Sequence, residues 1–296
     1  MHQNTNKNQP SKHQPVLLDE VLECLNPQRG ERYLDLTAGY GGHASAVMQL
    51  TGTEPTLVDR DEHAVTELHK LFVDADIRHQ DFLSASQQLQ QDGARFAMIL
   101  ADLGVSSPHL NEAERGFAIS QTGPLDMRMD NRQELSADTI VNSYSEADLA
   151  DILWRYGEEP KARQIARLIT GNRPITTTTE LALIVARAWP GRSRVHPATR
   201  TFQALRIAVN DELQLLERSL PIWLELLEPG GRIAIISFHS LEDAIVKKAF
   251  AEASGERYDA ELRLLTKRPI TASNHELVSN PRARSAKLRA AVKIKI

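Results

Sequence analysis

Residues 33–44 place one carboxylate and three glycines where an expected strand turns into an expected helix. Asp35 ends the apolar run, and Gly39, Gly41 and Gly42 follow it. Glycines in such a loop allow a tight turn and a close approach of backbone N–H groups to a nucleotide-type cofactor. A carboxylate at the strand end would repel a pyrophosphate but can reach the ammonium group of S-adenosyl-L-methionine, directly or through water. We therefore predict an S-adenosyl-L-methionine site here, with Asp35 as a ligand.

The same loop fits other interpretations. The spacing Gly39-x-Gly41-x-x-Ala44 matches the dinucleotide fingerprint, so an NAD-dependent oxidoreductase is the alternative. A turn that only needs flexible glycines is the structural interpretation. Three glycines within four residues, close behind a strand-end acid, exceed ordinary turn chemistry, and a cofactor loop is therefore favoured.

Two further expected strands also end in an acidic residue. The strand at 55–61 ends in acidic residues. Its Asp59 lies 18 residues beyond Gly41, near the offset of roughly 20 at which a carboxylate reaches ribose hydroxyls. The strand at 96–101 is followed by Asp102. The carboxyl ends of the strands line the ligand crevice of an open α/β sheet, so Asp35, Asp59 and Asp102 should converge there.

Aromatic and imidazole side chains follow other expected strands. Phe82 comes after a short strand at 77–79 and could contact an adenine ring, although an isolated Phe is more often a core residue. His239 follows the strand at 232–238 and faces the expected crevice. Ser240, by contrast, fits a helix N-cap because Asp243 stands three residues later.

The order of these elements predicts an α/β fold with a Rossmann-like class I methyltransferase sheet and an inserted, mostly helical domain. Two strands expected at 261–265 and 288–294 would form the closing antiparallel pair of such a sheet, which a dinucleotide-binding fold lacks. We expect a disordered tail at 1–14. We expect one discontinuous methyltransferase domain over 15–108 and 207–296, and a helical substrate-recognition domain over 109–206.

Composition limits the cellular setting. The apolar runs are too short to cross a bilayer, and the N-terminus lacks the apolar region of a signal peptide, so we expect a soluble cytoplasmic protein without a membrane partner. Cys24 is the only cysteine, which excludes an intrachain disulfide and a cysteine-cluster zinc site. No compact ligand cluster is visible in the sequence, so we expect no metal.

Basic residues are concentrated in two stretches despite the net charge of -4. Each of the ranges 160–206 and 263–296 contains nine Lys or Arg and one acid. Such segregation indicates a phosphate-facing surface. The alternative is that these side chains are solvated or pair with the acidic half of the chain. The residues expected to contact phosphates are Arg192, Arg194, Arg200, Arg282 and Arg284.

With these motifs in view, the chain resembles the bacterial 16S rRNA (cytosine-N4)-methyltransferase family. A characteristic segment is Asp102-Leu103-Gly104-Val105-Ser106-Ser107-Pro108. The matching segments are 14–20, 41–43, 59–61, 102–108, 114–117, 123–130, 196–204, 237–243 and 280–285.

The resemblance implies methylation of N4 of a P-site cytidine of 16S rRNA, cytidine 1402 in that family, with S-adenosyl-L-methionine as methyl donor. The resemblance also implies that the residues which contact the cofactor in this family correspond here to Gly41, Gly42, His43, Asp59, Phe82 and Asp102. His109 stands where the family has Gln, and the imidazole can make one hydrogen bond in its place.

The catalytic step needs an acceptor for a hydrogen of the cytosine amine, and Asp102 is the candidate. A non-catalytic RNA-binding ribosome-assembly protein remains a third hypothesis. The sequence leaves open whether naked 16S rRNA or the small ribosomal subunit is the substrate, and it leaves the oligomeric state open.

Overall fold

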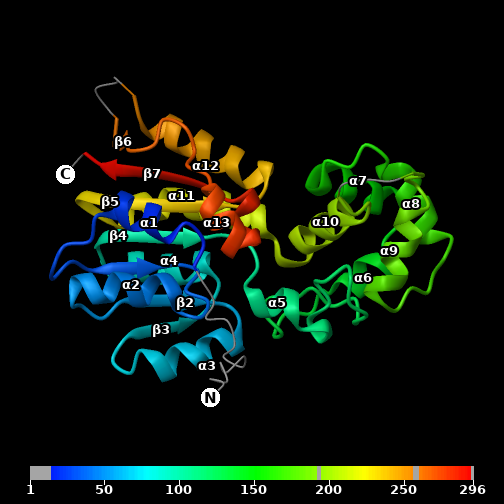
Figure 1. The fold of residues 1–296 in the computed structure, drawn as a ribbon, viewed down its shortest axis with the longest axis horizontal. Coiled ribbons are helices and arrows are strands. Elements are labelled where there is room, and N and C mark those ends of the chain that lie inside the picture. The colour runs from blue at the N-terminus through cyan, green and yellow to red at the C-terminus, as the bar shows by residue number, and fades with distance from the viewer. Residues whose placement is uncertain (1–14, 192–194, 256–259, 295–296) are drawn as a thin grey trace, which may run out of the picture.

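The computed structural model describes residues 15–191, 195–255 and 260–294, which form a seven-stranded sheet with helices on both faces and a helical lobe beside it (Figure 1). The strand order is β3-β2-β1-β4-β5-β7-β6. Strands β1 to β5 pair in parallel, and β7 is antiparallel to both neighbours. This is the Rossmann-like class I methyltransferase sheet predicted from the sequence. The strands are β1 (Tyr33–Asp35), β2 (Thr56–Asp59), β3 (Asp76–His79), β4 (Phe96–Asp102), β5 (Leu227–Ser237), β6 (Leu262–Leu264) and β7 (Lys287–Lys293).

Helices cover the two faces of the sheet and build the lobe (Figure 1). One face carries α1 (Leu18–Leu25), α2 (Gly42–Thr51), α3 (Glu62–Leu71) and α13 (Asn274–Ser279), and the other carries α4 (Phe82–Gln91), α11 (Glu212–Leu226) and α12 (Ser240–Ala253). The lobe contains α6 (Ala137–Ser143), α7 (Glu146–Gly157), α8 (Ala162–Thr170), α9 (Thr178–Ala186) and α10 (Thr199–Asn210). Shorter segments are α5 (Ser107–Asn111) and the 3₁₀ turns η1 (Ala113–Arg115) and η2 (Pro281–Ser285).

Side chains of the central strands alternate between two apolar cores. In β4, Met98 and Leu100 pack toward α1 and α2, whereas Ile99 and Ala101 pack toward α4 and α11. Because successive residues of a strand point to opposite faces, Asp102 emerges on the same face as Met98 and Leu100. The alternation therefore directs Asp102 toward the N-terminal end of α2.

The start of β5 differs from the strand expected at 232–238. Strand β5 already begins at Leu227, and the pairing with β4 jumps from Phe96–Leu227 to Met98–Arg232. Pro229, Gly230 and Gly231 thus lie inside an irregular strand. A Cβ on Gly231 would lie 2.8 Å from the oxygen of Glu228 and 3.1 Å from that of Phe96, which explains the glycine there.

A sharp break separates the lobe from the sheet. Helix α11 begins at Glu212, directly after α10, because Asp211 adopts a left-handed conformation with φ 52° between the two helices. Helix α10 ends at Asn210. The amphipathic pattern continues across the break, so periodicity alone hides it.

The lobe has a hydrophobic core of its own, which extends from Phe117 to Val209. In Figure 1 it lies off the carboxyl ends of β4 and β5. The proposed domain boundaries at 108/109 and 206/207 stay a prediction. Among the described residues, no helix combines the length and apolar character required to span a bilayer.

Candidate functional site

A cavity of about 180 Å³ opens at the carboxyl ends of the parallel strands. Its wall combines the glycine loop, the ends of β2 and β4, the start of α4 and the segments after β5 and α13. The polar and aromatic residues that line it include Thr37, His43, Asp59, Arg60, Asp61, Gln80, Asp81, Phe82, Asp102, Ser106, His109, Glu212, Phe238, Glu242, Asn280 and Arg282. The crevice predicted from the strand ends is therefore present.

The glycine loop turns tightly beneath this cavity. The backbone N–H of Gly39 donates to Asp59 Oδ2 at 2.7 Å, which ties the loop to the end of β2. Gly41 has φ 74°, and a Cβ on it would lie 2.5 Å from the ring of Phe72. A Cβ on Gly42 would lie 2.6 Å from the ring of Pro15. These two glycines are thus required by packing, and Gly41, a predicted cofactor contact, does not line the cavity.

Asp59 lines the cavity with both carboxylate oxygens fixed by backbone N–H groups. Oδ1 accepts from Asp61 at 2.8 Å and Oδ2 accepts from Gly39. Burial raises the pKa of Asp59. Each carboxylate oxygen retains a second lone pair for a hydroxyl donor, so the predicted ribose contact fits this geometry and stays a prediction.

Asp35 does not take the position expected of a cofactor ligand. Its side chain is 1% exposed and does not line the cavity. Oδ2 accepts from the hydroxyl of Tyr33 at 2.9 Å and Oδ1 accepts from the backbone N–H of Thr37 at 3.2 Å. A direct contact with the cofactor ammonium does not fit this position, because Asp35 is buried beneath the loop and supports it from below, whereas a contact through water stays a prediction.

Burial raises the pKa of Asp35 from 3.8 to about 7, although the hydrogen bonds from Tyr33 and Thr37 oppose the shift. The folded state then binds this proton more tightly than the unfolded chain, so the stability gained at low pH is lost as pH rises from about 4 to 7. A shift of this size corresponds to roughly 4 kcal/mol.

Asp35→Asn lacks this titrating group. As pH rises from about 4 to about 8, we therefore expect its free energy of unfolding to rise by up to ~4 kcal/mol relative to that of the native chain. Urea denaturation at both pH values measures the difference in free energy of unfolding. The exposed Asp74→Asn is the matched control. Parallel stability curves for Asp35→Asn and the native chain would contradict the assignment of a buried titrating carboxyl to this position.

Asp102 meets the cavity directly. Its side chain is 24% exposed, its backbone N–H donates to Thr37 Oγ1 at 2.6 Å, and Oδ2 lies 3.9 Å from Nδ1 of His43. The other oxygen, Oδ1, is buried without a hydrogen-bond partner among the described residues. Burial raises the pKa of Asp102 well above its usual range, and the negative charges of Asp35 and Glu242 add to this. An unpaired acceptor at a ligand cavity indicates that a donor or a cation completes the site.

Phe82 forms an apolar wall of the cavity at the β3 end of the crevice. Its ring packs edge-on against Trp223, with 5.5 Å between centroids and an interplanar angle of 75°. The preceding Asp81 caps α4 by accepting from the N–H groups of Leu83 and Ser84. The adenine contact expected of Phe82 fits this position and stays a prediction.

His109 is used within the protein. Its Nδ1 accepts from the backbone N–H of Ser106 at 3.2 Å, so Nε2 carries the proton, and Nε2 lies 2.9 Å from Asp61 Oδ2. The predicted polar contact of His109 with the cofactor does not fit this geometry because both ring nitrogens face protein groups. Burial acts to raise the pKa of Asp61, but His109 and Arg115 overcome it and hold the pKa at about 2.

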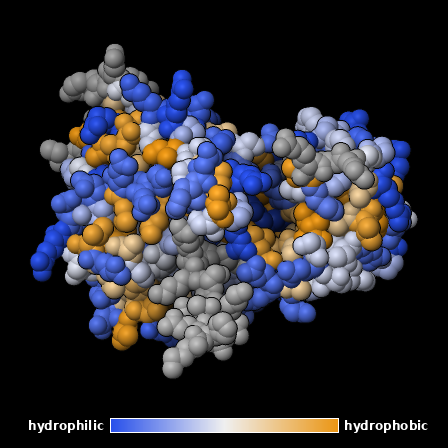
Figure 2. Space-filling model, viewed as in Figure 1, coloured by the Kyte–Doolittle hydropathy of each residue, from blue (hydrophilic) through white to orange (hydrophobic). Residues whose placement is uncertain are grey.

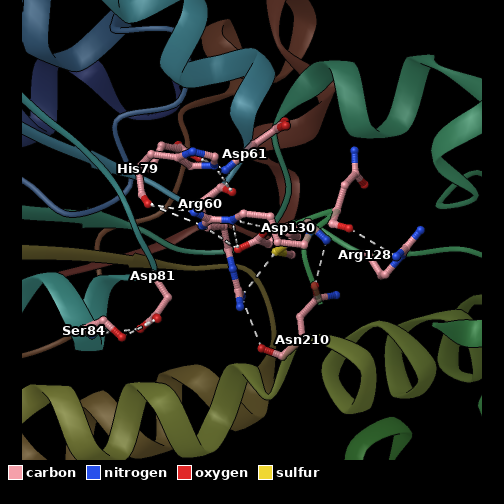
Figure 3. A network of polar contacts seen from close by, with 12 residues as sticks. Arg60, Asp61, His79, Asp81, Ser84, Arg128, Asp130 and Asn210 are labelled. Atoms are coloured by element: carbon pink, nitrogen blue, oxygen red, sulfur yellow. Dashed lines mark hydrogen bonds and ion pairs between the residues drawn. The ribbon is translucent and has the colours of Figure 1, made fainter. Parts of the chain in front are cut away.

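A polar network around Arg60 joins the sheet to the segment that leads into the lobe (Figure 3). Arg60 Nη1 donates to the backbone oxygen of Asn210 at 3.2 Å. Asn210 in turn donates to the backbone oxygen of Met127 and accepts from the N–H of Met129. The backbone oxygen of Arg60 lies 3.2 Å from Nε2 of His79. The end of β2, the 127–129 segment and the last residue of α10 are thus held at one point.

Glu212, His239 and Glu242 bring three ligand-type atoms within 4.8 Å of one another. His239 Nδ1 accepts from the N–H of Glu242, so its proton is on Nε2 and that nitrogen cannot ligate a metal. Glu212 forms a bidentate pair with Arg206, with both contacts at 2.8 Å. The cluster therefore fits a buried charge network better than a metal centre.

The family model of the MraW methylases matches residues 10–294. The chain belongs to the MraW methylase family. The ribosomal RNA small subunit methyltransferase H of Nostoc punctiforme is 48% identical over 286 residues, which cover 95% of this chain and 94% of the relative. The protein of the same description from Acidobacterium capsulatum is 46% identical over 297 residues, covering 95% and 98%. Among solved structures, a SAM-dependent O-methyltransferase from Thermotoga maritima aligns with a TM-score of 0.43 and 9% identity, covering 96% of this chain and 68% of that one.

The basic stretches of this MraW methylase family member divide into two groups. Several of their side chains pair inside the protein: Arg206 with Glu212, Arg289 and Lys287 with Asp243, and Arg173 with backbone oxygens of α6 and Tyr144. The number of Lys and Arg residues in these two stretches is therefore larger than the number available to contact RNA phosphates.

Other basic residues are exposed, and one of them borders the cavity. Arg282 lines the cavity and donates to Asn111 Oδ1 at 2.8 Å, Arg284 follows it in η2, and Arg200 donates to the backbone oxygen of Glu158 at 3.2 Å. Arg192 and Arg194 lie outside the described residues. The phosphate contacts expected of all five arginines stay a prediction.

Several cavity residues of this MraW methylase family member escaped the sequence reading, among them Thr37, Glu212, Phe238 and Glu242. Phe238 directly follows β5, so the rule that ligands bind at the carboxyl ends of strands could have found it. Glu212 reaches the cavity only through the break at Asp211, and no local pattern announces that break.

Proposed function

We propose that this chain transfers a methyl group from S-adenosyl-L-methionine to the N4 amine of a P-site cytidine, at position 1402, of 16S rRNA in the cytoplasm. Membership of the MraW methylase family and relatives described as ribosomal RNA small subunit methyltransferase H support the reaction class and the RNA. The observation that carries the proposal is the unpaired, buried Oδ1 of Asp102 at the cavity where the glycine loop meets β4.

The residues at the cavity suit S-adenosyl-L-methionine. Asp59 and Phe82 would hold the ribose and adenine, and the backbone of the Gly39–Gly42 loop would lie along the remainder, with His43 and Asp102 toward the charged end. The cofactor supplies an electrophilic methyl group on a sulfonium. A positive charge beside Asp102 favours its carboxylate form, which offsets the burial that raises its pKa.

Asp102 would act on the cytosine amine. The lone pair of N4 is delocalised into the ring, so the chain must orient the amine in line with the methyl group. Asp102 would accept one N4 hydrogen. As the bond between N4 and the methyl carbon forms and the bond between that carbon and sulfur breaks, the N4 proton would pass to the Asp102 carboxylate and S-adenosylhomocysteine would be left. A base paired in a helix cannot reach this position, so the target cytidine must leave its stack.

Labelled S-adenosyl-L-methionine tests the proposal. The protein is incubated with extracted 16S rRNA and, separately, with immature small subunits, and the RNA is digested to nucleosides. Labelled N4-methylcytidine is the expected product. Label on another base would refute the assigned atom, and no label on either substrate would favour a non-catalytic RNA-binding protein. Calorimetric binding of NAD but not of S-adenosyl-L-methionine would favour the oxidoreductase.

If 16S rRNA binds at the cavity mouth through its phosphates, its affinity should depend on salt concentration. Each phosphate contact contributes roughly 0.7 to 0.9 to the log-log slope of affinity against salt. We expect Arg282→Ala with Arg284→Ala to weaken RNA binding and to flatten the slope by about 1 to 2, with cofactor affinity intact.

Arg95→Ala is the matched control because Arg95 lies at the amino end of β4, away from the cavity. Filter binding over a salt series gives the slopes, and thermal denaturation monitors folding. A lowered melting temperature with an unchanged slope would show that these arginines hold the structure together and do not contact phosphates.

A further inference from the structure

The cavity continues past Asp102 on the side away from the predicted adenosine contacts. Asp59 ends β2 and Phe82 follows β3, whereas Phe238 follows β5 on the other side of β4. Neighbouring strands lie about 4.8 Å apart. One half of the cavity therefore flanks the cofactor loop, and the other half is enclosed by the residues after β5.

Phe238 stands beside Asp102. Ile236 of β5 is the pairing partner of Asp102, and Phe238 is two residues further on, so its side chain leaves the strand on the same face. The ring is half-buried and lines the cavity. It packs against Gly104, where an added Cβ would lie 3.4 Å from the ring. The result is an apolar wall next to the unpaired oxygen of Asp102.

Glu242 fixes the turn that carries Phe238. Its Oε2 accepts from the N–H of Phe238 at 2.8 Å and from that of His239 at 3.2 Å. His239 Nε2, which carries the proton, lies 3.2 Å from Glu242 Oε1. The Glu242 side chain is 2% exposed yet borders the cavity. Burial acts to raise the pKa of Glu242, but the interaction with His239, the charge of Arg206 and the hydrogen bond from the N–H of Phe238 overcome it and lower the pKa, so Glu242 presents a carboxylate to the cavity.

We propose that Phe238, Glu242 and Asp102 form the subsite for the methylated base, in which Phe238 stacks on the ring and the two carboxylates accept the hydrogens of the exocyclic amine. This inference rests on the proposed cytosine methylation. Cytosine presents an amine donor at position 4, whereas uracil presents a carbonyl oxygen there. A carbonyl facing two acceptors would lose its hydrogen bonds, so the subsite selects cytosine over uracil.

The stacking role is tested with Phe238→Leu. Removing a base-stacking aromatic weakens binding by about 5- to 150-fold. We expect kcat/KM for the RNA to fall within this range and the calorimetric Kd for S-adenosyl-L-methionine to stay unchanged. Phe238→Tyr should retain most of the activity because its ring can stack. Phe250→Leu, a buried core change on α12, controls for destabilisation.

The role of Glu242 is tested with Glu242→Gln. The amide oxygen can keep the two N–H groups of the turn, while the amide NH₂ takes the place of Oε1 beside His239 Nε2 and adds a donor that a uracil oxygen can use. Thermal denaturation checks that the turn stays folded. Two 16S rRNA transcripts that differ only in cytidine or uridine at the target position compete for the protein in the presence of S-adenosylhomocysteine. We expect the native chain to prefer the cytidine transcript and Glu242→Gln to reduce that preference at least about tenfold.

The outcomes separate this inference from the proposed function. If the native chain methylates cytidine but Phe238→Leu retains its kcat/KM, or Glu242→Gln retains the full preference, the base subsite is overturned and the methylation stands. Equal losses in Phe238→Leu and Phe250→Leu would likewise overturn the stacking role. No methylation by the native chain overturns the proposed function itself.

Discussion

Asp102→Asn should lower kcat for methyl transfer by about 10²- to 10⁴-fold, the range for removal of a positioned proton acceptor. The amide has nearly the same shape, but it cannot take up the N4 proton. Single-turnover assays with labelled cofactor measure the loss, and calorimetry reports the affinity for S-adenosyl-L-methionine. Asp151→Asn, an exposed change on α7, is the control.

The same substitution should stabilise the fold near neutral pH. The pKa of Asp102 is raised in the folded state, so the native chain loses stability as pH rises above the unfolded pKa of 3.8. Asparagine does not titrate in this range. The melting temperature of Asp102→Asn should therefore exceed that of the native chain by more at pH 8 than at pH 5. Full methylation by Asp102→Asn with normal cofactor affinity would remove Asp102 from both proposed roles.

Arg115→Ala should destabilise the protein by about 3–5 kcal/mol, as expected when one partner of a buried ion pair is removed. Arg115 Nη1 contacts both oxygens of Asp61, at 3.2 and 3.3 Å, and Nη2 donates to the backbone oxygens of Arg128 and Met129. The side chains of Arg115 and Asp61 are 9% and 3% exposed. The substitution leaves a buried carboxylate and two backbone acceptors without this partner.

Urea denaturation gives the free energy of unfolding for Arg115→Ala. The control is Arg155→Ala, whose pair with Asp151 is more than half exposed and contributes at most about 1 kcal/mol. Because Asp61 has its pKa held at about 2, the contribution of the pair should persist above pH 4 and disappear as pH falls toward 2. Equal losses of unfolding free energy in the two variants would show that the buried contacts of Arg115 with Asp61 and with the 128–129 backbone do not stabilise the protein.

Local patterns in the sequence were sufficient for the sheet and for the position of the crevice. Apolar runs that end in Asp59 and Asp102, and a glycine loop after Asp35, predicted three neighbouring strands and the edge at which they meet. The two C-terminal strands predicted the antiparallel pair β6–β7. These features depend on strand propensity, side-chain alternation and turn chemistry, all of which act over a few residues.

The depth of each carboxylate depended on the tertiary structure. Asp35 and Asp102 both end strands and both point toward α2, but the glycine loop folds over Asp35, where Tyr33 and Thr37 occupy its oxygens. Asp102 remains open to the cavity because the chain leaves β4 toward the lobe. Sequence spacing specifies the strand end, but it cannot specify which loop covers it.

Charge pairing also depended on contacts between distant segments. His109 meets Asp61 from 48 residues away, and Arg206 is neutralised by Glu212 across the break at Asp211. The sequence by itself determined where the strands end, where the glycine loop lies and which family motifs are present, because these features are local. Only the tertiary structure decided which polar groups are satisfied inside the protein and which face the cavity, because burial and pairing depend on the approach of segments that are remote in the chain.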